Sequence, residues 1–235
     1  MVPSRFALSF CVFLSFQTPL ASAQGGAEPG DPMRIVILVD NSQALIDEMP
    51  LVRRGLRQFL NSLPQNHELM LVTTGGQMNI RVQPTRDYLD VLQAANEIQV
   101  NQSSGNAMLA SVEEIYERYL RGVERRHLML VIISNDGADM SQRVTNERMN
   151  AMLQQVPKSG VRVNALLMNP TWSQRSIGSG LVRTFTLELI KRTEGAFESA
   201  TAVTSAVKLK TLASRIAQQY KELSPNKSPT PEFRR

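Results

Sequence analysis

Residues 34–45 read RIVILVDNSQAL, and this stretch decides the fold. Five apolar residues at positions 35–39 run without interruption into Asp40, and Ser42 follows two positions later. A continuous apolar run of this length is typical of a strand that is buried on both faces, as in a parallel sheet. The stretch therefore predicts a central strand at residues 34–39 whose end carries a carboxylate and a hydroxyl.

The rest of the chain alternates strand-like and helix-like segments. Strands are predicted at residues 68–73, 78–82, 127–133, 161–167 and 196–198. Helices are predicted at residues 50–63, 86–98, 106–121, 140–155, 181–192 and 203–223. The link at residues 74–77 is short enough for a hairpin, which makes the second and third strands antiparallel. This order predicts an α/β fold with an open, mostly parallel, doubly wound sheet, one antiparallel edge strand and helices on both faces.

The first residues have the composition of an export signal. Arg5 precedes an apolar run at residues 6–16, and Ala21-Ser22-Ala23 forms a small-residue cleavage site before Gln24. This order is typical of a secretory signal peptide. We therefore expect residues 1–23 to be removed on export to the periplasm or the extracellular space. Cys11 is the only cysteine and would leave with this segment, so the mature chain would contain neither disulfides nor a thiol nucleophile.

The remaining chain is predicted to form one domain. Residues 24–32 are rich in Gly and Pro and predict a linker, and residues 33–223 predict the domain itself. Residues 224–235 contain three prolines and predict a disordered tail. No second apolar run approaches the length of about 20 residues that spans a bilayer.

Polar side chains follow two of the apolar strands. Asp40 and Asp136 each follow a strand, and the carboxyl ends of parallel strands meet at the same edge of a sheet. Two carboxylates that close together favour a bound cation or a raised pKa. Carboxylate, hydroxyl and amide oxygens suit a hard cation such as Mg²⁺. Capping is an equally good explanation, in which Asp40 or Ser42 begins the first helix and Asp136-Gly137 forms a turn.

Three segments of the chain resemble the von Willebrand factor type A domain, over about residues 33–220. They are Asp40-Asn41-Ser42-Gln43-Ala44, the stretch around Asn106 (SGNAML, residues 104–109), and Asp136-Gly137. The metal-ion-dependent adhesion site of that family has an Asp-x-Ser-x-Ser motif after the first strand. It adds a Thr before a central helix and an Asp after the fourth strand.

The resemblance implies a metal site formed by Asp40, Ser42, Asn106 and Asp136, which would hold Mg²⁺ or Mn²⁺. It also implies a protein ligand that offers an acidic side chain to the ion. Two positions depart from the family pattern, because Ala44 stands in place of Ser and Asn106 in place of Thr. Such a degenerate site either holds the ion with added water or has lost it while keeping the fold. Asp139 is expected to begin the next helix.

The sequence offers little support for an enzyme. His67 and His127 begin strands, whereas Asp40 and Ser42 follow the end of one, so a Ser-His-Asp triad is not expected. We interpret both histidines as ordinary surface or strand-edge residues. The segment 40–43 contains no glycine, which argues against dinucleotide and phosphate-loop sites.

An exported protein-binding module is the function that we expect, with the carboxyl edge of the sheet as its contact surface. Asn41 and Gln43 lie at this edge, and the long loop at residues 169–180 adds Trp172 and Arg175, which are favoured interface residues. Trp172 would alternatively pack back on the domain. The other function that remains open is a metal-free structural component of a cell-envelope complex. A nucleic-acid partner is not expected, because the chain has no basic stripe and few aromatic residues.

Overall fold

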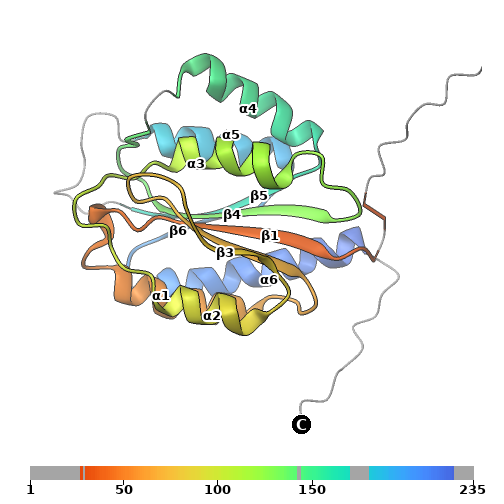
Figure 1. The fold of residues 1–235 in the computed structure, drawn as a ribbon, viewed down its shortest axis with the longest axis horizontal. Coiled ribbons are helices and arrows are strands. Elements are labelled where there is room, and N and C mark those ends of the chain that lie inside the picture. Colours follow the sequence, from red (N-terminus) through yellow and green to blue (C-terminus); the bar gives the residue numbers. More distant parts are fainter. Residues whose placement is uncertain (1–26, 29, 142–143, 170–179, 225–235) are drawn as a thin grey trace, which may run out of the picture.

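A six-stranded sheet lies between two layers of helices (Figure 1). The structure is a computed structural model, and it describes residues 27–28, 30–141, 144–169 and 180–224. The strands are β1 (Met33–Val39), β2 (Glu68–Thr73), β3 (Asn79–Thr85), β4 (His127–Asn135), β5 (Arg162–Met168) and β6 (Phe197–Ala200). The helices are α1 (Met49–Ser62), α2 (Tyr88–Asn96), α3 (Met108–Ile115), α4 (Asn146–Lys158), α5 (Leu181–Thr193) and α6 (Ser205–Leu223). A 3₁₀ turn, η1 (Gln43–Leu45), precedes α1, and a π-helical turn, η2 (Tyr116–Leu120), continues α3.

The strands are arranged in the order β3-β2-β1-β4-β5-β6. β1 lies in the centre and pairs in parallel with β2 and β4, while β3 pairs antiparallel with β2. The predicted fold class is confirmed, including the single antiparallel strand at one side of the sheet. β1 and β4 are buried along almost their whole length, which explains why both read as uninterrupted apolar runs.

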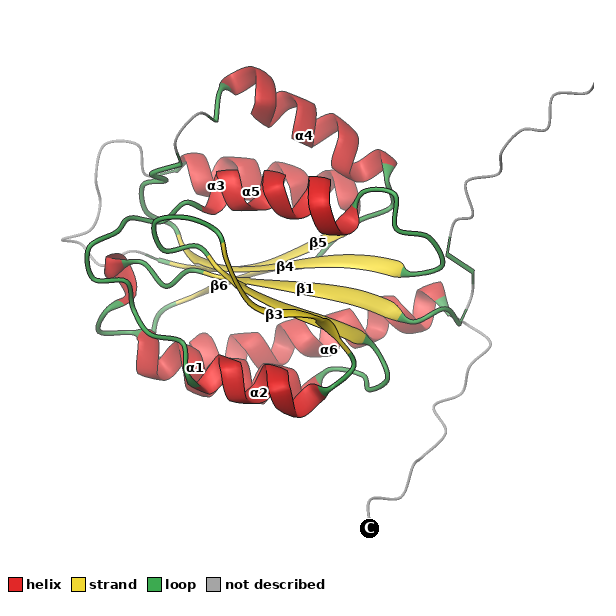
Figure 2. Cartoon of the chain, viewed as in Figure 1, coloured by secondary structure: helices red, strands yellow, loops and turns green. Residues whose placement is uncertain are grey.

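Helices cover both faces of the sheet (Figure 2), and each face has its own hydrophobic core. Alternate residues of β1 point to opposite faces, so Ile35 and Ile37 pack against α1, α2 and α6, while Val36 and Leu38 pack against α3, α4 and α5. Phe59 of α1 is fully buried in the first core. Burial on both faces holds the central strands rigidly, and the loops at their ends are therefore built on a fixed frame.

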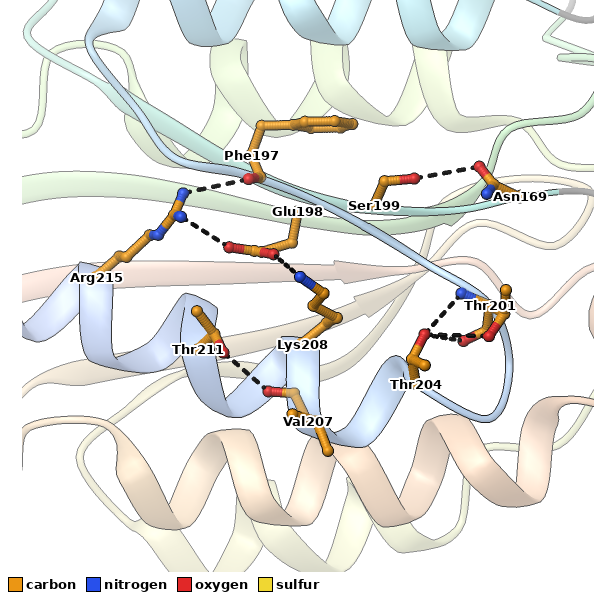
Figure 3. A network of polar contacts seen from close by, with 10 residues as sticks. All are labelled: Asn169, Phe197, Glu198, Ser199, Thr201, Thr204, Val207, Lys208, Thr211 and Arg215. Carbon is orange, nitrogen blue, oxygen red and sulfur yellow. Dashed lines mark hydrogen bonds and ion pairs between the residues drawn. The ribbon is translucent and has the colours of Figure 1, made fainter.

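The two outer strands are each protected against pairing with another chain. In β3, Pro84 lacks an amide donor and the register with β2 shifts twice. β6 has only four residues, and side chains of α6 cover it (Figure 3). Glu198 of β6 is buried and pairs with Lys208 at 3.0 Å and with Arg215 at 3.1 Å. Arg215 also donates a hydrogen bond of 3.3 Å to the carbonyl oxygen of Phe197.

Among the helix boundaries that differ from the prediction, those at the start of α3 and α4 affect the site. α3 begins at Met108, so Asn106 lies in the loop before it, and α4 begins at Asn146, not at residue 140. The expectation that Asp139 begins α4 was wrong, because Thr145 is the capping residue of that helix. The Asp139 carboxylate instead accepts a hydrogen bond of 3.0 Å from the amide of Leu109, in the first turn of α3. A long-range contact to another helix thus holds this segment outside α4.

The opposite side of the sheet, where the parallel strands begin, is called the amino edge. His67 and His127 lie there, as predicted, but they are buried and not on the surface. Both rings pack edge-on against Tyr220 of α6, with centroid distances of 4.5 and 6.1 Å. Nδ1 of His67 accepts a hydrogen bond of 3.1 Å from the amide of Met33.

Both described ends of the chain meet at the amino edge. The amide of Gly30 donates to the hydroxyl of Ser224 at 3.0 Å, and the amide of His127 donates to the carbonyl oxygen of Pro32 at 3.1 Å. The described part of the expected linker is therefore tied to the domain, and Ser224, the first residue of the expected tail, is buried. Residues 1–26 and 225–235 lie outside the described residues. Among the helices that the structure describes, none combines the length and apolar character needed to cross a bilayer.

Candidate functional site

The loops that follow β1, β2 and β4, the connection between α2 and α3, and Asn169 after β5 meet at the other side of the sheet, which is called the carboxyl edge. Asn41 ties three of the loops there together. Its side-chain oxygen accepts from the amide of Gly75 at 2.7 Å, and its side-chain nitrogen donates to the carbonyl oxygen of Gln99 at 2.8 Å. Its backbone oxygen accepts from the amide of Asn101 at 2.8 Å. Asn41 thus holds the edge together, and both polar groups of its side chain are used within the protein.

Asp40 is the buried centre of this edge. One carboxylate oxygen accepts from the amide of Ser42 at 2.8 Å. The other accepts from the backbone amide of Asn135 at 3.2 Å and also from the side-chain amide of Asn135. Burial raises the pKa of Asp40 above its ordinary value, and the groups of Ser42 and Asn135 offset part of that rise. Asp40 therefore links the end of β1 to the end of β4.

Asn106 lies deep in the same edge, between β2 and β4. Its side-chain oxygen accepts from the hydroxyl of Thr74 at 2.7 Å, and its side-chain nitrogen donates to the hydroxyl of Ser134 at 2.8 Å. Its backbone oxygen accepts from the amide of Met140 at 2.7 Å. The residue is 2% exposed, so its amide serves as a buried connector between the ends of β2 and β4, the two strands on either side of β1.

Asp136 completes the set of predicted ligands, and it is paired with a cation. One of its carboxylate oxygens accepts a hydrogen bond from Nε of Arg183, in the first turn of α5. Nη2 of Arg183 also donates to the side-chain oxygen of Asn169 at 3.1 Å. The other carboxylate oxygen of Asp136 is buried and has no partner among the described residues, and the same holds for the hydroxyl oxygen of Ser42.

The four predicted ligands therefore lie at one edge, but their arrangement does not fit a divalent cation. The carboxylate of Asp40 faces three amide donors, and the side chain of Asn106 is engaged at both ends. The guanidinium of Arg183 lies directly against Asp136. Mg²⁺ takes six oxygen ligands in near-octahedral order, several of which are usually water, and within the described residues only two buried oxygens of this set lack a hydrogen-bond partner.

Helix capping, the other explanation predicted for Asp40 and Ser42, accounts for their positions only in part. Glu48 precedes the first residue of α1, so neither Asp40 nor Ser42 begins that helix. Ser42 precedes the 3₁₀ turn η1, but its side chain makes no capping hydrogen bond. The hydroxyl of Ser42 lies close enough to the Asp40 carboxylate to lower its pKa, although it makes no hydrogen bond of good geometry there.

The residues that were predicted to contact a protein partner differ in their exposure. Gln43 is exposed at the carboxyl edge, whereas Asn41 is half-buried and serves the internal contacts described above. Trp172 and Arg175 lie outside the described residues. Two residues that the sequence interpretation missed are Asn135 and Arg183, which supply the donors that face Asp40 and Asp136. Asn135 directly precedes Asp136 in the sequence and could have been included with it.

Exposed apolar side chains lie at the same edge of the sheet as these polar residues. The structure describes seven large apolar residues that are exposed, and five of them lie in the connections after β1, β4, β5 and β6 or in the first turn of the following helix. These five are Ile46, Met140, Leu181, Val203 and Val207. Met140 is 64% exposed and Val203 is 81% exposed. The four strands are direct neighbours in the sheet, so these residues lie at the same edge of it, on the connections to both helix layers.

A sequence model of the von Willebrand factor type A domain matches residues 35–138 of the chain. That range contains all four residues of the predicted metal site. No protein of curated function matches the sequence at a significant level.

Solved structures of low sequence identity share the fold. The conserved hypothetical protein BatB from Bacteroides thetaiotaomicron is 14% identical, with a TM-score of 0.61 over 80% of this chain and 99% of that one. An aerotolerance-related membrane protein from Bacteroides fragilis is 15% identical, with a TM-score of 0.60 over 79% of this chain and 99% of that one. Proximal thread matrix protein 1 from the mussel byssus, solved with a zinc-occupied adhesion motif, is 9% identical. Its TM-score is 0.59 over 82% of this chain and 49% of that one.

Proposed function

We propose that this chain is an exported protein of the von Willebrand factor type A domain class, and that it binds a protein partner at the carboxyl edge of its sheet. The family match over residues 35–138 and the shared fold support the domain class. Domains of this class often mediate protein interaction. The proposed role is therefore binding and not catalysis.

The observation that carries this proposal is the exposed apolar set at the carboxyl edge. Burying such side chains against a partner is favourable, at about 25 cal/mol per Å² of apolar surface. Exposed apolar side chains that gather around a polar centre are a common property of interaction sites. Here the rigid double core fixes the loops that carry Ile46, Met140 and Val203, so the surface is largely ordered before binding.

The predicted Mg²⁺ or Mn²⁺ ion is not required by this proposal. The residues that would hold it, Asp40, Ser42, Asn106 and Asp136, are mostly engaged with donors of the protein itself. We propose that partner binding proceeds without the ion. Partner binding without a metal ion is also expected of the alternative function, in which the domain is a structural component that contacts other proteins of a cell-envelope complex.

The test is affinity capture from the exported fraction of the source cells, with quantitative mass spectrometry, followed by binding measurements on the purified partner. Met140→Asp and Val203→Asp place a charge on the proposed surface and should weaken partner binding at least tenfold. Leu89→Asp is a matched control, because Leu89 is 70% exposed in the first turn of α2, at the amino edge. A partner that is lost equally with Leu89→Asp, or kept by all three variants, would refute the carboxyl edge as the binding surface.

Export has a separate test. The N-terminal sequence of the protein recovered from the source cells should begin at Gln24, after removal of residues 1–23. Recovery of the intact N-terminus from the cytoplasm would contradict the export proposal and leave the binding proposal unaffected.

A further inference from the structure

We infer that the guanidinium of Arg183, together with the side-chain amide of Asn135, occupies the place of the metal ion at the carboxyl edge, and that Arg183 excludes divalent cations from it. This inference deepens the proposed function and rests on it only for the consequence that partner binding is independent of metal. The exclusion of the ion is a property of the isolated chain and is tested on that chain.

Several contacts hold the guanidinium of Arg183 in place. Its Nε donates to Asp136, and its Nη2 donates to Asn169 at 3.1 Å. The side-chain oxygen of Asn169 also accepts from the hydroxyl of Ser199 on β6 at 3.2 Å (Figure 3). The guanidinium carbon lies 5.9 Å from the ring centroid of Phe197. Contacts from β5, β6 and the end of β4 thus place a fixed positive charge beside Asp136.

The side-chain amide of Asn135 has a defined orientation. The amide of Gly137 donates to the side-chain oxygen of Asn135 at 2.6 Å. Because this contact requires the oxygen on that side, the NH₂ group must face Asp40, to which it donates. The two carboxylates therefore have different protein donors, an amide for Asp40 and a guanidinium for Asp136. Together these donors supply the stabilisation that a cation would otherwise give.

Two buried oxygens are left that could contact a cation. Within the described residues, one oxygen of Asp136 and the hydroxyl of Ser42 are buried without a hydrogen-bond partner. An ion that approached these oxygens would come within a few ångströms of a permanent positive charge, and like charges in a buried site repel strongly. Removing that charge, while keeping both carboxylates, should therefore restore affinity for a divalent cation.

The experiment is a titration of folded protein with MgCl₂ and MnCl₂, followed by calorimetry and thermal melting. The parent chain should show no saturable heat and no rise in melting temperature up to about 10 mM metal. Arg183→Met keeps the length and apolar stem of the side chain without its charge, and Arg183→Gln is a second neutral variant. Either should gain saturable binding, with a melting temperature raised by roughly 3–6 °C at ten times Kd.

Three further variants separate charge from shape. Arg183→Lys keeps a positive charge and should bind no more metal than the parent chain. The double variant Arg183→Met with Asp136→Asn should lose the gained binding, because the freed carboxylate is gone. Arg192→Met is the matched control, since Arg192 lies on the same helix in an exposed pair with Glu188 at 2.7 Å and should bind no metal.

Two results would overturn the inference. One is saturable metal binding by the parent chain that Asp136→Asn abolishes. The other is a pair of folded variants, Arg183→Met and Arg183→Gln, that gain no binding. Partner binding to the parent chain in the presence of a chelator is measured separately. If metal exclusion holds while the variants at the carboxyl edge leave partner binding unchanged, only the proposed function fails.

Discussion

At the carboxyl edge of the sheet, Asp40 is a buried carboxylate surrounded by amide donors. At the amino edge, His67 is a buried imidazole whose Nδ1 accepts from the amide of Met33. Burial raises the pKa of Asp40 and lowers the pKa of His67 to about 4, in both cases because the charged form is poorly solvated. Burial therefore favours the neutral form of both Asp40 and His67, but the two groups respond to acid in opposite ways.

The direction of each response depends on whether the folded or the unfolded chain binds the proton more tightly. The pKa of His67 in the folded protein lies below its unfolded value of 6.5, so its contribution to stability is complete above pH 6.5 and is lost as the pH falls toward 4. The pKa of Asp40 in the folded protein lies above its unfolded value of 3.8. Its contribution is therefore favourable below pH 3.8 and is lost as the pH rises through the raised pKa.

The amino edge and the carboxyl edge differ in the kinds of residues that they contain. The amino edge joins the described ends of the chain through Gly30 and Ser224, and it contains the network of Arg34, Glu68 and Arg126. The carboxyl edge combines unpaired buried oxygens with exposed apolar side chains such as Met140. The exposed apolar side chains, which contribute little to stability, are thus found mostly at the edge to which we assign binding.

Asp40→Ala should give the largest effect and would break the carboxyl edge. It leaves three amide donors without their acceptor, so we expect a loss of about 4 kcal/mol in the free energy of unfolding. Asp40→Asn keeps one acceptor oxygen and should cost less than half as much. Urea unfolding followed by circular dichroism measures both. A loss below about 1 kcal/mol for Asp40→Ala would show that these bonds do not hold β1 to β4.

The second-largest effect on stability should come from acid, which weakens the amino edge. Between pH 7 and pH 4.5 we expect the protonation of His67 to lower the free energy of unfolding by about 2 kcal/mol, because the unfolded chain binds the proton more readily. His67→Asn keeps an acceptor near the position of Nδ1 without a titrating ring. This variant should show a flatter pH profile over that range in urea unfolding. An unchanged slope would assign the acid response to other groups.

Glu68→Gln should have a smaller effect on the same edge. Burial favours the neutral form of Glu68, but its hydrogen bonds and ion pairs with Arg34 and Arg126 outweigh burial, and its pKa is lowered. We expect the substitution to cost about 1 kcal/mol, because the glutamine cannot keep both pairs. Urea unfolding at low and high salt measures this cost. Full retention of stability at low salt would show that the network contributes nothing.

The smallest effects on stability should come from the apolar residues of the carboxyl edge. Met140→Ser and Val203→Ser change side chains that are mostly exposed, so each should alter the free energy of unfolding by less than about 0.5 kcal/mol. The same variants should still weaken partner binding. Thermal melting checks the stability, and a loss above about 1.5 kcal/mol would mean that these residues serve folding.

The fold could be predicted because burial imposes simple local patterns. β1 and β4 are covered on both faces, and this makes them continuous apolar runs, while the short link between β2 and β3 predicts their antiparallel pairing. The beginning of α4 could not be predicted in this way. Met140 and Val144 suggest helical spacing, but Asp139 and Ser141 bond the first turn of α3 and hold the segment apart.

The composition of the candidate site was predictable only in part. Asp40, Ser42, Asn106 and Asp136 could be placed at one edge, because the ends of parallel strands meet there. Arg183 could not be found, because in the sequence it is one charged residue in an amphipathic helix, and its partner Asp136 lies 47 positions away. The difference between a carboxylate that holds a metal and one that holds a guanidinium depends on such tertiary contacts.

The protected outer strands also determine from which direction another molecule can bind. A neighbour that approaches β3 meets Pro84 and a shifted register, and one that approaches β6 meets the guanidinium of Arg215 on the carbonyl oxygen of Phe197. Lateral growth of the sheet into a fibre is therefore opposed on both sides. The ends of the strands remain accessible. At high concentration this protein should therefore contact other proteins through the ends of its strands, and the sheets of neighbouring molecules should not join.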